Sequence, residues 1–267
     1  MSPPVFLARP EELAAGDAGT VTLVGEEARH AIQVRRLRPG EVVDLVDGAG
    51  RRVRGAIAAM SGSGAASRLD VAVSEVSDEP ALSPRLVLAQ ALAKGGRDEQ
   101  AIAMACEVGI DGVIPWQAQR SIVRWEGPRA AKGRARWESA VVAAAKQSRR
   151  AWLPSVAEVH TSLAAPVAEA ARMGGAALVL HERATTSISE VPLPECPPEG
   201  QAGDVVIIVG PEGGITDEEL AELSAAGAQA VRLGPHVLRS GTAGVVATAH
   251  LSERLGRWAV EPAPAGE

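Results

Sequence analysis

The chain has few aromatic residues and few cysteines. Its 267 residues include no Tyr, one Phe, five Trp and two Cys. Such a shortage of aromatic rings makes a base-stacking platform of the RNA-recognition type unexpected. Cys106 and Cys196 stand far apart and belong to no Cys-x-x-Cys or Cys/His cluster. This spacing argues against a disulfide framework and against a zinc site.

Long apolar runs are also missing. No run of about 18 apolar residues occurs, and the segment that begins Met1-Ser-Pro-Pro lacks the apolar region of a signal peptide. Hydrophobic residues make up 46% of the chain and charged residues 22%, which is typical of a globular protein. We therefore expect a cytoplasmic protein without a membrane partner, with one large domain or two ordinary ones.

The net charge of −6 conceals two basic segments. Between Arg29 and Arg54, seven arginines stand against three acidic residues. Between Arg85 and Pro154, twelve Lys or Arg residues stand against six acidic ones. Basic segments on an acidic protein indicate a localised surface that binds a polyanion. Charge alone leaves open the alternative of a solvated surface with scattered arginines.

Residues 1–76 are predicted to form a small β-barrel. Short apolar stretches are separated by glycine-containing turns, and Asp47-Gly48 is a hairpin signal. A helix is expected from about Glu26 to Leu37. The strands are expected at 21–24, 42–46, 53–57 and 69–73. Residues 77–84 are polar and contain two prolines, which predicts a linker.

Strands and helices then alternate from residue 85 to residue 260, and residues 261–267 are expected to be a tail. The alternation predicts an α/β domain with a mostly parallel sheet covered by helices. The expected strands are 86–92, 112–114 (closed by Pro115), 177–180, 205–209 and 230–233, and the expected helices are 97–108, 132–150, 163–173 and 242–255.

The stretch from Val205 onward is predicted to hold a ligand. Five β-branched residues suit a strand buried on both faces, and Gly210, Gly213 and Gly214 then allow a sharp turn. A Thr216/Glu219 capping box starts a helix near Asp217. This arrangement is the usual ligand mouth of an α/β sheet. The loop lacks the Lys-Ser/Thr of a phosphate-binding loop, yet the residues alone leave phosphate and S-adenosylmethionine equally open.

Five separated groups of residues carry a more specific signal. They are His30–Gly40 with Asp47-Gly48; Lys94, Ala101-Ile102, Glu107–Gly109, Ile114-Pro115 and Arg120-Ser121; Lys146–Arg150 with Pro154; Gly210–Gly214; and Leu233–Arg239. Together, and in this order, they resemble the RsmE family of uridine-N3 methyltransferases, which act on small-subunit (16S) ribosomal RNA.

The resemblance implies an α/β fold of the SPOUT class, with a parallel sheet and a C-terminal trefoil knot. It also implies a preceding PUA-like β-barrel that helps to grip RNA, a homodimer, and S-adenosylmethionine bound in the knot without a metal. One departure concerns Ser240-Gly241-Thr242, where the family usually has a Thr-Glu-Thr-like segment. The role of that acidic residue therefore cannot be transferred to this chain.

The resemblance also assigns candidate cofactor-binding residues, most of which would act through backbone groups. Arg239 has three open roles: it can hold the donor's carboxylate, bind an RNA phosphate or pair with Glu212. The candidates are Leu180, His181, Gly210, Pro211, Glu212, Gly213, Leu233, Gly234, Val237, Leu238, Arg239 and Thr242.

Candidate RNA-binding residues are spread over both predicted domains. Arg120 is expected near the target base, and His181 and Glu212 are the candidate general bases, so these three are the candidate catalytic residues. The candidates for RNA contacts are His30, Arg35, Arg36, Lys94, Arg97, Arg120, Arg124, Arg149 and Arg150.

Other functions remain open at this point. A related SPOUT enzyme would methylate a ribose 2′-hydroxyl instead of a base. A non-catalytic RNA-binding assembly factor would keep the fold, and the missing acid near Gly241 favours it slightly. A nucleotide-binding regulator would bind ATP or NAD in place of the methyl donor.

Overall fold

The computed structural model describes residues 3–14, 16, 19–195 and 202–259. The chain forms two compact units, one of residues 1–81 with 142–153 and one of residues 82–141 with 154–267. Cys196 and the expected tail 261–267 lie outside the described residues. The domain limits expected from the sequence stay a prediction. They placed residues 142–153 in the second domain, whereas these residues group with the first unit in the structure.

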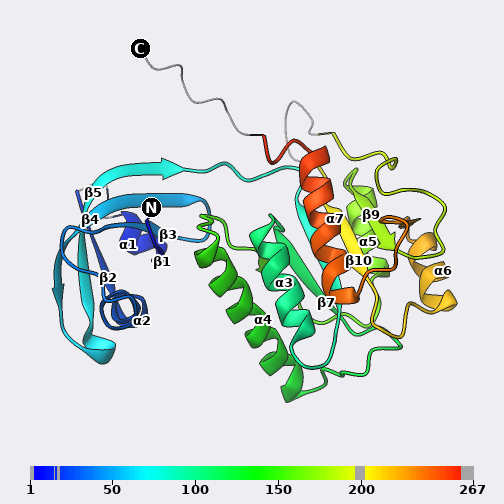
Figure 1. The fold of residues 1–267 in the computed structure, drawn as a ribbon, viewed down its shortest axis with the longest axis horizontal. Helices are drawn as coiled ribbons and strands as arrows, with labels where there is room; N and C mark the ends of the chain where they lie inside the picture. Colours follow the sequence, from blue (N-terminus) through cyan, green and yellow to red (C-terminus); the bar gives the residue numbers. More distant parts are fainter. Residues whose placement is uncertain (1–2, 15, 17–18, 196–201, 260–267) are drawn as a thin grey trace, which may run out of the picture. The chain divides into compact units, whose positions relative to one another are not determined.

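The first unit is built on a five-stranded mixed sheet in the order β1-β3-β4-β5-β2 (Figure 1). β1 is parallel to β3, whereas the other neighbours are antiparallel. Among the described residues the edge strands β1 and β2 do not pair with each other, so the sheet curls into a PUA-like half-barrel instead of a closed barrel. The strands are β1 (Val5–Leu7), β2 (Thr20–Val24), β3 (Val42–Val46), β4 (Arg51–Ser61) and β5 (Arg68–Asp78).

Short helices cover the inner face of this sheet. α1 (Pro10–Ala14) precedes β2, and α2 (Gly25–Arg29) continues into a π-helical turn over His30–Val34. A 3₁₀ turn (Gly64–Ala66) joins β4 to β5. The expected helix from about Glu26 to Leu37 is therefore present, but its second half is π-helical. The core is apolar and includes Phe6, Leu13, Leu23, Leu45 and Ile57, each almost fully buried.

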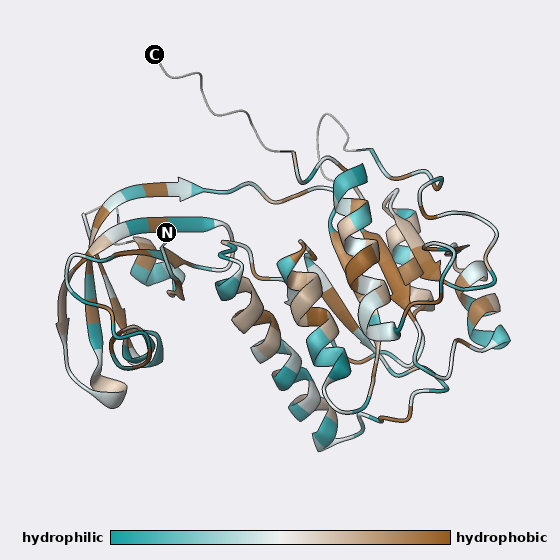
Figure 2. Ribbon diagram, in the orientation of Figure 1, coloured by the Kyte–Doolittle hydropathy of each residue, from teal (hydrophilic) through white to brown (hydrophobic). Residues whose placement is uncertain are grey.

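The second unit contains a six-stranded sheet in the order β11-β9-β10-β6-β7-β8, and all its pairs are parallel. Its strands are strongly apolar (Figure 2), as burial on both faces requires. The strands are β6 (Leu86–Ala91), β7 (Gly112–Trp116), β8 (Ser155–Val156), β9 (Ala176–Leu180), β10 (Val205–Val209) and β11 (Gln229–Val231).

Helices lie on both faces of this sheet. α3 (Arg97–Glu107) and α7 (Ser240–Arg254) pack side by side over β6 and β10 (Figure 1). α5 (Ala164–Arg172) and α6 (Asp217–Ala225) pack on the opposite face. α4 (Pro128–Gln147) contributes Trp137, which meets Trp125 edge-on at 5.3 Å between ring centroids.

Most elements expected from the sequence are present, but several have other limits. β4 and β5 run well beyond the expected 53–57 and 69–73, and β5 reaches Asp78, inside the expected linker. α4 ends at Gln147, before the expected end at Arg150. β7 runs through Pro115, because the Pro115 carbonyl accepts from the His160 N–H and no proline N–H is needed. α4 begins at Pro128, four residues before the expected start at Lys132. The short elements β1, α1 and β8 were not predicted, since two to five residues carry no periodicity.

Two glycines of α7 offer a matched test of this packing. A Cβ added to Gly241 would lie 3.7 Å from the nearest atom, the Arg97 carbonyl oxygen. A Cβ added to Gly244 would lie 2.9 Å from Cδ1 of the buried Leu88. We expect Gly241→Ala to stabilise the chain by about 0.4–1 kcal/mol. Gly244→Ala is expected to destabilise it by about 1–3 kcal/mol through overpacking.

Denaturant unfolding of both variants beside the wild type checks this expectation. Equal effects of the two substitutions would contradict the packing of α7 on β6.

Candidate functional site

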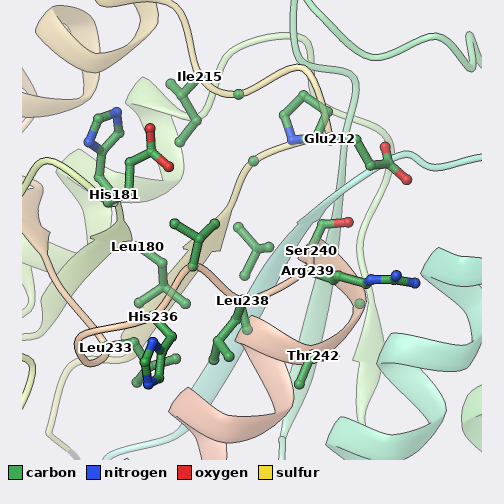
Figure 3. Close-up of a pocket in the computed structure, with 18 of the residues that line it drawn as sticks. Leu180, His181, Glu212, Ile215, Leu233, His236, Leu238, Arg239, Ser240 and Thr242 are labelled. Carbon is green, nitrogen blue, oxygen red and sulfur yellow. The ribbon is translucent and has the colours of Figure 1, made fainter.

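A cleft of about 1310 Å³ lies where β9, β10 and β11 end (Figure 3). The three strands are parallel, so their carboxyl ends meet at one edge of the sheet. Ligands bind at this edge in open α/β sheets. The loops after the three strands and the first residues of α7 line the cleft.

The loop after β10 has a shape that only glycine allows. A Cβ on Gly210 would lie 2.6 Å from Cγ1 of Ile215, which is itself buried. Gly214 has a φ of 76°, and its N–H donates to the Pro211 carbonyl at 2.9 Å. The loop then enters α6, whose predicted capping box is present: the Thr216 hydroxyl accepts from the Glu219 N–H at 3.1 Å.

The loop after β11 forms another wall. Leu180, Leu233 and Leu238 supply the apolar part of the cleft (Figure 3), whereas Val237 is 75% exposed. The backbone N–H of Arg232 donates to the carbonyl of Thr186, in the loop after β9, at 2.8 Å. The loops that follow β9 and β11 are thereby joined next to the cleft.

The structure brings all the candidate cofactor-binding residues together. Each of the twelve lines this one cleft, although they come from four segments of the chain. Their individual roles stay a prediction. They are Leu180, His181, Gly210, Pro211, Glu212, Gly213, Leu233, Gly234, Val237, Leu238, Arg239 and Thr242.

Two arginines from other segments of the chain, Arg97 and Arg120, contact the glycine loop. Nη1 of Arg97 lies 3.2 Å from Oε1 of Glu212. Nη1 of Arg120 donates to the Gly213 carbonyl at 3.1 Å. The Glu212 carboxylate therefore pairs with Arg97 in this structure, and the roles open to Arg239 stay a prediction.

The ring of His181 has a defined tautomer. Its Nδ1 accepts from the backbone N–H of Arg183 at 3.2 Å, so a neutral ring carries its proton on Nε2. His181 lies at the end of β9, and Figure 3 shows it on the other side of the view from Glu212. His181 therefore offers the cleft a hydrogen-bond donor.

The candidate RNA-binding residues divide between the two units. Arg97 and Arg120 line the cleft, while Lys94 and Arg124 are exposed in the same unit but do not line it. The remaining five belong to the first unit. Arg35, Arg36 and Arg149 are exposed there, whereas His30 and Arg150 are half-buried.

His30 is less exposed than a phosphate contact would suggest. Its ring meets Phe6 edge-on at 6.0 Å between centroids. Burial, followed by the charge of Lys146, lowers the pKa of His30 below its usual value. The lowered pKa disfavours the charged form of His30, so His30 is a weaker candidate for an ion pair with an RNA phosphate than the exposed arginines.

Several lining residues were missed from the sequence. Gln100 and Met104 follow Arg97 at helical spacing on α3, a signal that could have found them. Gly214, Pro235 and His236 lie within the two loop motifs but were not named as site residues, and the others flank predicted residues. The missed residues are Gln100, Met104, Glu182, Arg183, Val209, Gly214, Ile215, Arg232, Pro235, His236, Ser240, Gly241 and Ala243.

Within residues 3–14, 16, 19–195 and 202–259, no group of three His, Cys, Asp or Glu side chains is placed to hold a metal ion. The helices in the same residues include none that is long and apolar enough to cross a membrane.

Comparison with known proteins agrees with this geometry. A family described as an RNA methyltransferase domain matches residues 81–252, and one described as an RNA methyltransferase PUA domain matches residues 23–69. Ribosomal RNA small subunit methyltransferase E of Mycobacterium tuberculosis is 43% identical over 245 residues, which cover 91% of this chain and 90% of that protein. The chain belongs to the RsmE family.

Solved structures of the RsmE type share the fold. Ribosomal RNA small subunit methyltransferase E of Neisseria gonorrhoeae, bound to S-adenosyl methionine, is 28% identical with a TM-score of 0.78, covering 95% of this chain and 98% of that one. A putative methyltransferase of Legionella pneumophila, with S-adenosylmethionine bound, is 26% identical with a TM-score of 0.76 and the same coverage. The predicted family and α/β fold class are confirmed, while the knot stays a prediction.

The Arg97–Glu212 pair is open to solvent, with side chains 67% and 41% exposed. We expect Arg97→Gln and Glu212→Gln each to change the free energy of unfolding by less than about 0.5 kcal/mol, because exposed ion pairs stabilise little. Asp44, which is 2% exposed and bound by Arg52 and Arg54, is the control. Asp44→Asn is expected to cost about 1–3 kcal/mol, because it weakens the bonds that a buried acceptor makes to both arginines.

Thermal unfolding of the three variants provides the measurement. A large loss in Glu212→Gln would show that the pair stabilises the fold, so that any change in ligand binding could not be assigned to the cleft.

Proposed function

We propose that this protein transfers a methyl group from S-adenosylmethionine to N3 of a uridine in small-subunit ribosomal RNA. The observation that carries the proposal is the single cleft that gathers all twelve candidate cofactor residues in a chain of the RsmE family. Relatives named small-subunit methyltransferase E, and structures of the same fold with the donor bound, support it.

The residues of the cleft fit this donor. Glycine backbone and three leucines offer amide groups and an apolar surface, which suit an adenosine. The loop has no lysine of the phosphate-binding type, and Glu212 disfavours a phosphate there. The bound donor would supply a methyl group activated by its sulfonium.

Arg120 is proposed to favour the reactive form of the base. Methylation at N3 requires loss of the N3 proton, which places negative charge on the uracil carbonyl oxygens. Nη1 of Arg120 is engaged by the Gly213 carbonyl, and the other N–H groups of this exposed side chain can reach those oxygens. Because N3 lies on the pairing edge, the uridine has to be unpaired or flipped out.

The two candidate bases differ in their readiness to take that proton. The neutral ring of His181 carries its own proton on Nε2, which suits donation to a uracil oxygen. Oε1 of Glu212 contacts Arg97, which leaves Oε2 for the N3 proton. We therefore assign the proton acceptor to Glu212 and an orienting role to His181.

Other features of the family are proposed with the activity. A homodimer is proposed because the chain belongs to the RsmE family. A knotted C-terminal segment is proposed on the same ground. Ribosomal RNA as the substrate favours a cytoplasmic location.

The activity is tested by incubating the protein and methyl-labelled S-adenosylmethionine with small ribosomal subunits that lack native methylation. Nucleoside mass spectrometry of the RNA is expected to yield 3-methyluridine. Glu212→Gln is expected to lower the rate by about 10²–10⁴-fold, the usual contribution of a general base.

A ribose-methylated product would instead indicate a 2′-O methyltransferase. Donor binding without transfer would favour the assembly-factor function, and binding of ATP or NAD would favour the regulator.

Two arginines of the first unit hold backbone conformations that favour glycine. Arg36 has a φ of 55° and Arg149 a φ of 61°, and each closely follows the C-terminal end of a helix. Leu37 and Arg150 then donate back to the carbonyls of Ala31 and Ala145, which closes the helix end. An arginine there is less stable than a glycine by about 1 kcal/mol. Both side chains are exposed and positively charged, which supports a role in binding RNA phosphates.

We expect Arg36→Gly and Arg149→Gly to raise the free energy of unfolding by up to about 1 kcal/mol, because each relieves a left-handed arginine. The same variants are expected to weaken RNA binding. Each phosphate interaction that a variant removes should reduce the salt slope of log K by about 0.7–0.9. Fluorescence anisotropy at several salt concentrations measures this.

Arg36→Lys and Arg149→Lys are the controls, since they keep both the charge and the backbone conformation. Unchanged RNA affinity in the glycine variants would contradict the phosphate role.

A further inference from the structure

Glu219 makes more contacts than a helix cap requires. Its side chain is 5% exposed although it carries a carboxylate. Oε2 accepts from the Thr216 N–H at 2.9 Å, which completes the capping box of α6. Oε1 accepts from the N–H of Gln119 at 2.7 Å, a residue 100 positions earlier in the chain. A cap needs only the first of these bonds.

Gln119 is held on both sides. Its N–H donates to Glu219, and its carbonyl accepts from Nη2 of Arg124 at 2.9 Å. Arg120 follows it directly, with Nη1 bound to the Gly213 carbonyl at 3.1 Å. A Cβ added to Gly213 would lie 3.0 Å from Cβ of Arg120, so the loop after β7 and the glycine loop touch here.

We propose that Glu219 is a positioning residue for the methyl transfer, acting through Gln119 to hold Arg120 over the glycine loop. The inference rests on the proposed function, because it assumes that Arg120 acts on the target base. A buried carboxylate bonded to two backbone N–H groups is costly to disturb. It therefore fixes the loop after β7 against α6, and the guanidinium of Arg120 is aimed before the RNA arrives.

Thr216→Ala provides a matched control. It removes the hydroxyl that accepts from the Glu219 N–H, so it weakens the same capping box, but it leaves the bond from Gln119 to Glu219 in place. Both Glu219→Ala and Thr216→Ala should lower the melting temperature. Only Glu219→Ala should release the loop that carries Arg120.

The test measures steady-state methyl transfer to small ribosomal subunits at saturating S-adenosylmethionine, with donor affinity determined by calorimetry. Glu219→Ala is expected to lower kcat/KM for RNA by about tenfold or more, and Thr216→Ala to leave it nearly unchanged. Donor affinity should change little in either variant. The double variant Glu219→Ala/Arg120→Ala should be no slower than Arg120→Ala alone, because both changes remove the same contribution, that of the positioned Arg120 side chain.

Hydrogen exchange gives a readout that does not depend on activity. The Gln119 amide should be protected in the wild type and in Thr216→Ala, and should exchange rapidly in Glu219→Ala. If Glu219→Ala does not fold, Glu219→Gln replaces it, because glutamine keeps the shape of the side chain and one acceptor oxygen. The Gln119 amide of Glu219→Gln is then expected to exchange faster than in the wild type but more slowly than an unprotected amide.

Two results would overturn the proposal. One is wild-type turnover in a Glu219 variant whose Gln119 amide exchanges rapidly. The other is full additivity with Arg120→Ala. A wild type that transfers no methyl group would instead refute the proposed function, while the exchange measurement would still decide whether Glu219 holds the loop.

Discussion

The parallel pairing of β10 with β6 and β9 is the constraint on which the second unit depends. Val205–Val209 bonds to strands on both sides and is buried on both faces, so its end is fixed in position and direction. Parallel neighbours must end at the same edge of the sheet, which brings Leu180, Gly210 and the loop after Val231 together. The cleft lies outside these strand ends, which is where open α/β sheets bind their ligands.

Close packing at two glycines transmits that constraint to the site. Gly244 lets α7 approach Leu88 and Val209, and Gly210 lets the loop turn beneath Ile215. The first brings the N-terminus of α7 to the cleft, and the second exposes the backbone that lines it. A side chain at either place would displace a wall of the cleft, so the close packing at these two glycines also sets the shape of the binding site.

Charge is used differently in the two units. In the first, the buried Asp44 is bound by Arg52 and Arg54, whereas Arg36 and Arg149 hold left-handed conformations at helix ends. Paired arginines therefore stabilise the half-barrel, whereas the two arginines with a positive φ cost stability. In the second unit, the buried carboxylate of Glu219 binds backbone N–H groups, so it orders a loop without neutralising a cation.

The sequence by itself determined the order of the longer strands and helices, the parallel class of the sheet in the second unit, the capping box at Thr216 and the two loops around the cleft. These features depend on local periodicity, glycine placement and motif spacing, which a single chain displays directly. Only the tertiary structure decided that Arg97 faces Glu212, that Nδ1 of His181 accepts from the Arg183 N–H and that Glu219 bonds to Gln119. It also decided that residues 142–153 join the first unit. These contacts join residues that are distant in the sequence or depend on side-chain rotamers. Neither long-range contacts nor rotamers produce a recognisable pattern in a single sequence.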